Sequence, residues 1–331
     1  MPAGGTAASS YQDKPTLQSP APSPSLVIGT RGSPLALKQA EEVRARLVAA
    51  HGIAPEAIAI EIIKTSGDRI QDRPLSEAGG KGLFTKEIEE ALLDGRIDLA
   101  VHSAKDVPTV LPEPLELSAF LPREDSRDAF VSFAASHPSL LPEGAVIGTS
   151  SLRRGAQMRR FRPDFRVVEF RGNVGTRMRK LEDGVADATL LAMAGLNRLG
   201  EADRAACVLD PEAFMPAPAQ GAICIETRVG DARVRALVSA LDDHEARVTV
   251  AAERAFLNLL DGSCRTPIAA LTQHAGGRLV MRGQILSPDG QQSFEDAVEG
   301  DADAAAALGR RLGEILLAAA GPDFMAALKA R

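Results

Sequence analysis

The sequence predicts an α/β protein of two similar, doubly wound lobes, followed by a small α+β C-terminal domain. Three observations lead to this fold class. Strands alternate with helices over the first two thirds of the chain, and one strand–turn–helix unit occurs twice. After His244 this alternation ends, and a helix, a strand hairpin and a helical remainder follow. Such alternation is typical of mostly parallel sheets with helices on both faces. At 331 residues, the chain is long enough for two or three domains.

The repeated unit is a short strand, a turn rich in hydroxyl groups, and a helix. Residues 27–47 read VIGTRGSPLALKQAEEVRARL, and residues 146–160 read VIGTSSLRRGAQMRR. Each copy has a later partner strand, within residues 95–108 and 184–200 respectively. We therefore expect lobe 1 to comprise residues 26–121 plus 222–239, and lobe 2 to comprise residues 127–215.

The chain is then expected to return to lobe 1 before it enters the small domain. Pro216 and Pro218 are typical of a crossing between lobes, and residues 221–226 are expected to rejoin the first sheet as a strand. Residues 244–331 should form the small domain, from a helix, a tight loop, a strand hairpin and a helical remainder. Residues 1–25, rich in Ala, Gly, Ser, Pro and Thr, are predicted to be a disordered tail.

Composition limits the classes of function. No apolar run approaches the ~18 residues that a membrane-spanning helix needs. Cys207, Cys224 and Cys264 are too widely spaced for a C-x-x-C metal site, so we expect no metal and a reducing, cytoplasmic compartment. The first two are expected to be core cysteines. The net charge of −6 and the lack of Trp argue against nucleic-acid binding.

One segment, residues 151–180, is strongly basic although the chain as a whole is acidic. It contains ten Arg or Lys residues and two acids. A solvated basic helix face would keep one helical period, but Arg153 and Arg154 begin a helix and Arg171 ends a strand. Concentrated positive charge on an acidic chain favours an anionic ligand. Guanidinium groups on separate loops suit several carboxylates better than one phosphate.

Polar groups follow four of the predicted strands, whose carboxyl ends should meet at one crevice. They lie in residues 30–33, 102–106, 149–154 and 171–177. Ser33 and Ser151 stand at helix starts, where they either cap the helix or help its free amides to bind an anion. His102 is expected to be a packed or capping residue.

Three further positions bear on chemistry. Asp106, directly after an apolar strand, is either a turn-forming carboxylate or one that stabilises a cation or accepts a proton. Residues 66–82 do not match a phosphate-binding P-loop and are predicted to form a mobile lid, with Lys81 reaching inward. Cys264 lies in a loop, where a lone cysteine is more often incidental than reactive, although Arg265 would favour its thiolate.

Together these motifs resemble the porphobilinogen deaminase family. The segments occur in family order between Val27 and Cys264: TRGSPLALKQA, GGKGLFTKEIE, DLAVHSAKDVP, REDSRDAFVS, GTSSLRR, RGNVGTR, AGLNRL, QGAICIE and AERAFLNLLDGSC. Each segment alone is moderate evidence, whereas the ordered set is highly specific. Glu77 stands where relatives often carry lysine in the lid. Ala219 and Ser263 replace common glycines, with little expected effect.

The resemblance implies two lobes like those of periplasmic binding proteins and a dipyrromethane cofactor joined to Cys264 of the small domain by a thioether. The enzyme would deaminate and polymerise four porphobilinogen molecules and release hydroxymethylbilane by hydrolysis, in tetrapyrrole (haem) biosynthesis. It would be a monomer that acts without nucleic acid or membrane. Asp106 would be catalytic, because it stabilises positive charge on the pyrrole. By similarity, the cofactor is bound by Lys105, Ser151, Arg153, Arg154 and Arg171, and the substrate by Arg31, Ser33, Arg177, Arg198 and Lys81.

Two other classes of function stay open at this point. A two-lobed solute-binding protein would explain the lobes and the arginines but gives no role to Cys264 or Asp106, and a nucleic-acid binder would use residues 151–180. For the enzyme, we expect Arg153→Ala or Arg171→Ala to impair cofactor assembly or elongation rather than folding, because the sequence gives neither arginine a reason to be buried.

Overall fold

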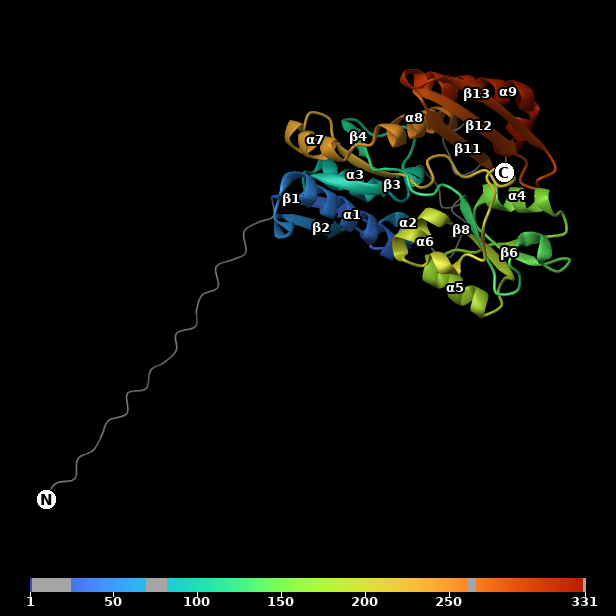
Figure 1. Ribbon diagram of the computed structural model, residues 1–331, viewed down its shortest axis with the longest axis horizontal. Helices are drawn as coiled ribbons and strands as arrows, with labels where there is room; N and C mark the ends of the chain where they lie inside the picture. The colour runs from blue at the N-terminus through green and yellow to red at the C-terminus, as the bar shows by residue number, and fades with distance from the viewer. Residues whose placement is uncertain (2–24, 70–81, 261–265, 330–331) are drawn as a thin grey trace.

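The computed structural model describes residues 1, 25–69, 82–260 and 266–329. Almost all of the predicted tail, most of the predicted lid including Lys81, and Cys264 lie outside these residues. Three sheets are present, two of five strands and one of three. Figure 1 shows one body around each sheet, with lobe 1 mainly in blue and teal but its α7 in gold, lobe 2 in green and yellow, and the small domain in orange and red. In the described residues, no helix combines the length and apolarity needed to cross a membrane.

Lobe 1 is a five-stranded sheet covered by helices on both faces. Its strands are β1 (Leu26–Thr30), β2 (Ile58–Ile62), β3 (Leu99–Ser103), β4 (Leu115–Phe120) and β10 (Ile223–Arg228), and its helices are α1 (Pro34–His51), α2 (Ser66–Arg69), α3 (Lys86–Leu93) and α7 (Ala232–Val238). The side chains of β3 alternate between the two faces. Leu99 and Val101 pack with α1 and α7, whereas Ala100 packs with α3 on the opposite face.

Lobe 2 repeats this design. Its strands are β5 (Asp128–Val131), β6 (Val146–Gly148), β7 (Arg166–Val168), β8 (Ala188–Ala192) and β9 (Cys207–Val208), and its helices are α4 (Leu152–Phe161), α5 (Val174–Glu182) and α6 (Met193–Leu199). The strand order is β7-β6-β8-β5-β9, against β2-β1-β3-β10-β4 in lobe 1. The predicted similarity of the two lobes is therefore confirmed.

The expectation of mostly parallel sheets is confirmed for strand direction, since four of the five strands in the sheet of each lobe run the same way. One strand in each is the exception: β10 in lobe 1 and β5 in lobe 2 are antiparallel to both of their neighbours. The physical reason is the crossing of the chain between lobes. Both β5 and β10 begin directly after a crossing, so each enters its sheet from the opposite end. The return of residues 221–226 to the first sheet, as part of β10, is confirmed.

The two crossings are tied to the small domain by a buried carboxylate, Glu253. Both its oxygens accept from the guanidinium of Arg123 at 2.9 Å, in the first crossing. They also accept the backbone N–H of Ala219, in the second crossing, at 2.5 Å and that of Thr272 at 2.8 Å. Ala219 has a positive φ of 61°, the left-handed region that favours glycine. This position therefore carries a conformational cost that the sequence alone did not reveal.

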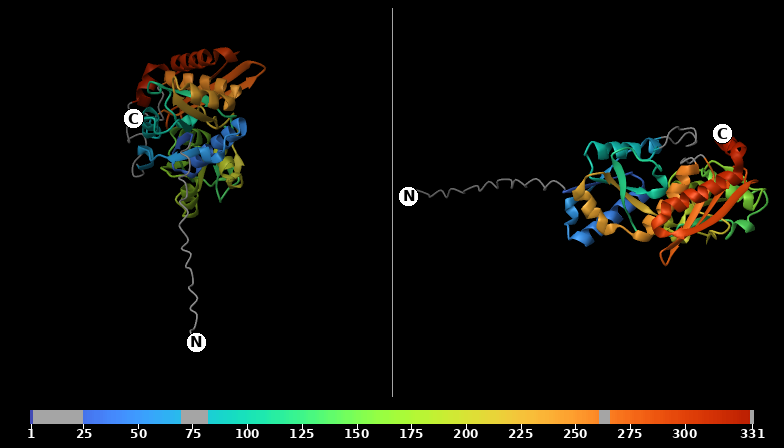
Figure 2. Two further views of the ribbon diagram at one scale, coloured as in Figure 1. Left: turned by 90° about the vertical axis from the view of Figure 1, so that its left-hand side faces the viewer. Right: turned by 90° about the horizontal axis from the view of Figure 1, so that it is seen from above.

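The small domain is a three-stranded antiparallel sheet with two helices packed on one face. It contains α8 (His244–Leu260), β11 (Ile268–Ala275), β12 (Arg278–Leu286), β13 (Ser293–Asp301) and α9 (Ala305–Lys329). The predicted helix and hairpin are confirmed. Phe256 of α8 and Leu312 of α9 are fully buried in its core. Figure 2 shows this domain lying against lobe 2 rather than at the far end of lobe 1. The exact domain boundaries stay a prediction.

We expect Gly309→Ala to destabilise the protein, because an added Cβ would overlap with the backbone carbonyl of Ala252 where α9 crosses α8. Overpacking of this kind costs about 1–3 kcal/mol and opposes the gain of about 1 kcal/mol in helix propensity. Thermal unfolding followed by circular dichroism measures the effect. Ala307→Leu, at an exposed position of the same helix, is the control. An unchanged melting temperature for Gly309→Ala would show that the two helices can separate without cost.

Candidate active site

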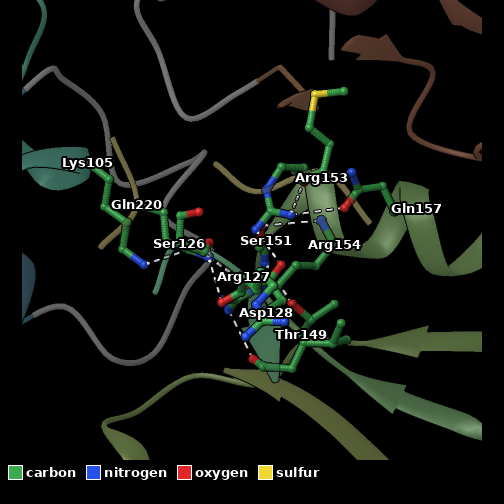
Figure 3. Close-up of polar contacts among 12 residues, drawn as sticks. Lys105, Ser126, Arg127, Asp128, Thr149, Ser151, Arg153, Arg154, Gln157 and Gln220 are labelled. Carbon is green, nitrogen blue, oxygen red and sulfur yellow. Dashed lines mark hydrogen bonds and ion pairs between the residues drawn. The ribbon is translucent and has the colours of Figure 1, made fainter. Parts of the chain in front are cut away.

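A buried carboxylate, Asp128, lies between two arginines at the start of β5 (Figure 3). Its Oδ2 pairs with Nη2 of Arg153 at 2.8 Å, and its Oδ1 accepts from Nη2 of Arg154 at 2.7 Å. No more than 8% of any of these three side chains is exposed. Burial opposes ionisation of Asp128, but the two guanidinium charges outweigh it and hold its pKa well below the usual range. Two cations and one anion leave net positive charge in the interior.

Gln220 connects this cluster to lobe 1. Its Nε2 donates to Oδ1 of Asp128 at 2.8 Å, and its Oε1 accepts from Nζ of Lys105 at 3.1 Å. Lys105 as a residue is partly exposed, but its ammonium group is buried. Burial, reinforced by the charge of Arg154, lowers the pKa of Lys105 to about 8. Lys105, Arg153 and Arg154 therefore form one cationic group, as the sequence predicted for the crevice.

Ser151 belongs to the same group. It is the N-cap of α4, where its hydroxyl accepts the backbone N–H of Arg154 at 3.4 Å. The capping role is thus present, and both arginines extend from the first turn of the helix. The helix start, at the carboxyl end of β6, brings the arginines toward the crevice.

Asp106 lies in the other half of the site, in lobe 1. It ends the 3₁₀ turn that follows β3, and it is exposed. A small cavity of about 60 Å³ is lined by Asp106, Arg31, Ser33, Gln39, Phe84, Thr85, His102 and Ser103, among others. The carbonyl groups of Val107 and Pro108, directly after Asp106, accept hydrogen bonds from Arg254 of α8. The small domain therefore anchors the segment that carries Asp106.

Arg31 is oriented by two neighbours on lobe 1. Its Nη2 pairs with Oδ1 of Asp68 at 2.5 Å, and its guanidinium lies 4.1 Å from the centre of the Phe84 ring. Burial opposes ionisation of Asp68, but hydrogen bonds from Arg31 and Thr65 prevail and lower its pKa. Ser33 caps α1 by accepting the backbone N–H of Ala36. A carboxylate of a ligand would meet Arg31 already held in place.

The remaining predicted arginines lie in lobe 2, on or shortly before α5 and α6. Arg177 of α5 donates from Nε to the carbonyl of Gly172, and burial together with the charge of Arg154 lowers its pKa to about 10. Arg171 lies close enough to affect Arg177 electrostatically. Arg198 of α6 donates to the carbonyl of Gly221 at 3.0 Å and pairs with Glu42 of α1 at 3.5 Å, so it bridges the two lobes. Lys81 and Cys264 lie outside the described residues.

One expectation about these arginines is wrong. Arg153 has a clear reason to be buried, because Asp128, the carbonyl of Met215 and Gln157 all bind its guanidinium. Removing it would leave the buried carboxylate with only Arg154 and Gln220, so a loss of stability must accompany any loss of activity. For Arg171 the expected effect stays a prediction.

Sequence reasoning missed the residues that hold the cations. Asp128 and Gln220 bind them directly, and Asp68 orients Arg31. The only available signal for Asp128 was its place in the motif REDSRDAF, directly before an apolar strand. By contrast, His102 was predicted to be a packed residue, and this is confirmed: it is buried and its Nε2 lies 3.0 Å from Oε2 of Glu226.

The other two cysteines do not contribute to the crevice. Cys224 is fully buried in β10, where burial raises its pKa to about 12, so the prediction of a core cysteine is confirmed. Cys207 is only partly buried, beside the core of lobe 2. In the described residues, no group of three or more His, Cys, Asp or Glu side chains could hold a metal ion.

Two family models match the chain. Residues 26–236 match porphobilinogen deaminase, dipyromethane cofactor binding domain, and residues 247–318 match porphobilinogen deaminase, C-terminal domain. The chain belongs to the porphobilinogen deaminase family. Porphobilinogen deaminase of Nitrobacter hamburgensis is 59% identical over 297 residues, which cover 90% of this chain and 94% of the relative. Porphobilinogen deaminase of Nitrobacter winogradskyi is 58% identical with the same coverage.

Solved structures of periplasmic proteins are similar to the two lobes. A periplasmic substrate-binding protein of an ABC transporter from Coxiella burnetii matches 69% of this chain and 96% of its own, with a TM-score of 0.40 and 14% identity. The periplasmic VFT2 domain of BvgS from Bordetella pertussis matches 69% and 92%, with a TM-score of 0.39 and 16% identity. The predicted fold class, two α/β lobes of similar design plus a small α+β domain, is confirmed by the sheets and helices of the chain itself.

We expect Asp128→Asn to lower the free energy of unfolding by about 3–5 kcal/mol, because it leaves two buried guanidinium groups without their anion. The folded-state pKa of Asp128 is lowered, so its stabilisation is fully present above the unfolded value of about 3.9, begins to decline below that value, and is lost as pH falls through the folded-state pKa. The gap between variant and wild type should therefore narrow in acid. Denaturant titrations at pH 7 and pH 3.5 measure both effects. The exposed Asp203→Asn is the control, and equal stability of all three proteins at pH 7 would refute the prediction.

Proposed function

We propose that this chain deaminates and polymerises four porphobilinogen molecules on a dipyrromethane primer bound through Cys264, and releases hydroxymethylbilane by hydrolysis. As a member of its family, the chain is a porphobilinogen deaminase, a transferase of tetrapyrrole biosynthesis with a dipyrromethane cofactor binding domain. The division of roles among its residues is our proposal. It is carried by one observation: a buried cationic group, Lys105 with Arg153 and Arg154, includes the residue directly before Asp106, and the charge of Asp106 acts on Lys105.

The buried cations suit a cofactor that carries several carboxylates. Nε of Arg153 and Nε of Arg154 are buried and have no hydrogen-bond partner among the described residues. A buried donor without a partner is costly, and a ligand carboxylate beside these guanidinium groups would offset the positive charge that Asp128 leaves uncompensated. When bound, dipyrromethane supplies the pyrrole carbon to which the first substrate unit is joined. We assign its binding to Lys105, Ser151, Arg153, Arg154 and Arg171, with Cys264 as the point of attachment.

The cavity in lobe 1 suits the incoming substrate. Arg31 is held by Asp68 and Phe84 with its free edge available for an acetate or propionate group, and Ser33 lies beside it. When porphobilinogen loses ammonia, positive charge develops on its pyrrole ring. Asp106, on the same cavity, would stabilise that charge and accept the proton released on joining. Arg177, Arg198 and Lys81 would hold further carboxylates of the substrate.

We also propose that the enzyme is a cytoplasmic monomer that acts without nucleic acid or membrane. The family resemblance supports the monomer, and the wide spacing of three cysteines supports a reducing compartment. The two cysteines in the described residues are free thiols.

Attachment of the cofactor is tested by intact-protein mass. We expect the purified wild type to exceed the mass of its sequence by one dipyrromethane, and Cys264→Ser to lack this excess, because serine cannot form the thioether. Cys207→Ser is the matched control and should keep it. An unmodified wild type that still consumes porphobilinogen at full rate would contradict the proposed attachment.

The role of Asp106 is tested by Asp106→Asn, which keeps the shape of the side chain but removes its charge. We expect kcat for porphobilinogen consumption to fall by about 10²–10⁴-fold, the range of general acid–base contributions, with little change in melting temperature. The exposed Asp323→Asn should behave as wild type. Unchanged turnover in Asp106→Asn would favour a protein that only binds organic anions.

A further inference from the structure

Gln157 lies where three parts of the molecule meet. It stands on α4, one turn after Arg153, and only 3% of it is exposed. Its Oε1 accepts from Nη1 of Arg153 at 2.9 Å. Its Nε2 donates to the carbonyl of Met215, in the second crossing, at 2.9 Å and to Oε1 of Gln284, in the small domain, at 3.2 Å. Both ends of the buried amide therefore have partners.

The small domain and the carbonyl of Met215 select the same orientation of this amide. Nε2 of Gln284, on β12, donates to Oε2 of Glu295 on β13 at 3.0 Å. An ionised carboxylate can only accept, so Gln284 must turn its oxygen toward Gln157. That oxygen selects the NH2 end of Gln157 and leaves the oxygen of Gln157 to face Arg153. Starting from Glu295, the donor and acceptor ends of Gln284 and then of Gln157 are thus assigned in turn.

The line continues into the crevice through an ion pair. Nη2 of Arg153 pairs with Oδ2 of Asp128, whose Oδ1 accepts a hydrogen bond from Gln220, which in turn accepts from Lys105. Figure 3 shows Lys105, Gln220, Asp128, Arg153 and Gln157 in this order. A side chain in the small domain is therefore connected, through directed bonds, to the residue that precedes Asp106.

The small domain packs so closely against α4 that a displacement of one would displace the other. The turn between β12 and β13 lies directly on the backbone of α4: a Cβ added to Gly290 would overlap with the carbonyl of Ala156 and would lie 2.7 Å from the backbone N of Arg160. Nη1 of Arg159 also donates to the carbonyl of Pro288 in this turn at 2.9 Å. The helix that carries Arg153 cannot shift without moving this turn.

We infer that Gln157, oriented by Gln284, is a positioning residue for Arg153, and that the small domain thereby sets the direction of this crevice arginine. The inference rests on the proposed function, in which Arg153 binds a cofactor carboxylate and the small domain carries Cys264. Docking of the small domain and orientation of Arg153 then become one event. Without Gln284, the amide of Gln157 loses one of the two acceptors that select its orientation and keeps only the carbonyl of Met215, so its oxygen is held less firmly against Arg153.

Gln284→Leu gives the sharpest test, because Gln284 contacts neither Arg153 nor the crevice. We expect kcat/KM for porphobilinogen to fall about tenfold, the scale of one lost hydrogen bond to a charged group, while the protein stays folded. Gln273→Leu, at an exposed position of β11, is the matched control and should keep wild-type kinetics. A lower melting temperature with wild-type kcat and KM in Gln284→Leu would overturn the inference, since that is the result expected of a purely structural contact.

A second variant separates orientation from packing. Gln157→Glu offers an acceptor to Arg153 whichever way the side chain turns, so it should restore part of the lost kcat/KM when it is combined with Gln284→Leu. A double variant no more active than Gln284→Leu alone would count against the inference. Failure of the proposed function would be distinct, because the wild type itself would then neither consume porphobilinogen nor carry the added mass.

Discussion

Positive charge held away from water is the constraint on which this crevice depends. Lys105, Arg153 and Arg154 lie close together in the interior, where each unpaired charge would cost several kcal/mol. Asp128 offsets part of this charge, and Gln220 accepts from the lysine. These partners come from β5, α4, the end of β3 and the second crossing. Because these charged and polar groups come from both lobes and from the crossing between them, their pairing constrains how the lobes pack together.

Carboxylates of the protein accompany the arginines elsewhere in the site as well. Asp68 pairs with Arg31 in lobe 1, and Glu42 pairs with Arg198 between the lobes. Planar guanidinium groups have five donors, so each arginine can keep its protein partner and still bind a ligand. The crevice is thus arranged before a ligand arrives, which reduces the entropy lost on binding.

Much of this architecture follows from local sequence patterns. The repeated strand–turn–helix unit predicted two lobes of one design, and the apolar alternation of residues 221–226 predicted their return to the first sheet. The direction of β5 and β10 was not predictable in this way, because it depends on where the chain crosses between lobes. The burial of Arg153 escaped prediction for a similar reason: its partner Asp128 lies on another strand, and no spacing in the sequence connects them.

Ala219 shows how firmly the crossings are held. A left-handed conformation costs an alanine about 1–2 kcal/mol, a penalty that glycine largely escapes. Its backbone N–H, however, donates to the carboxylate of Glu253, which also grips Arg123. The backbone of the second crossing is therefore held in an unfavourable conformation by a hydrogen bond to a carboxylate of the small domain. A change in the small domain that moves Glu253 would also release Ala219, so it would alter the connection between the two lobes.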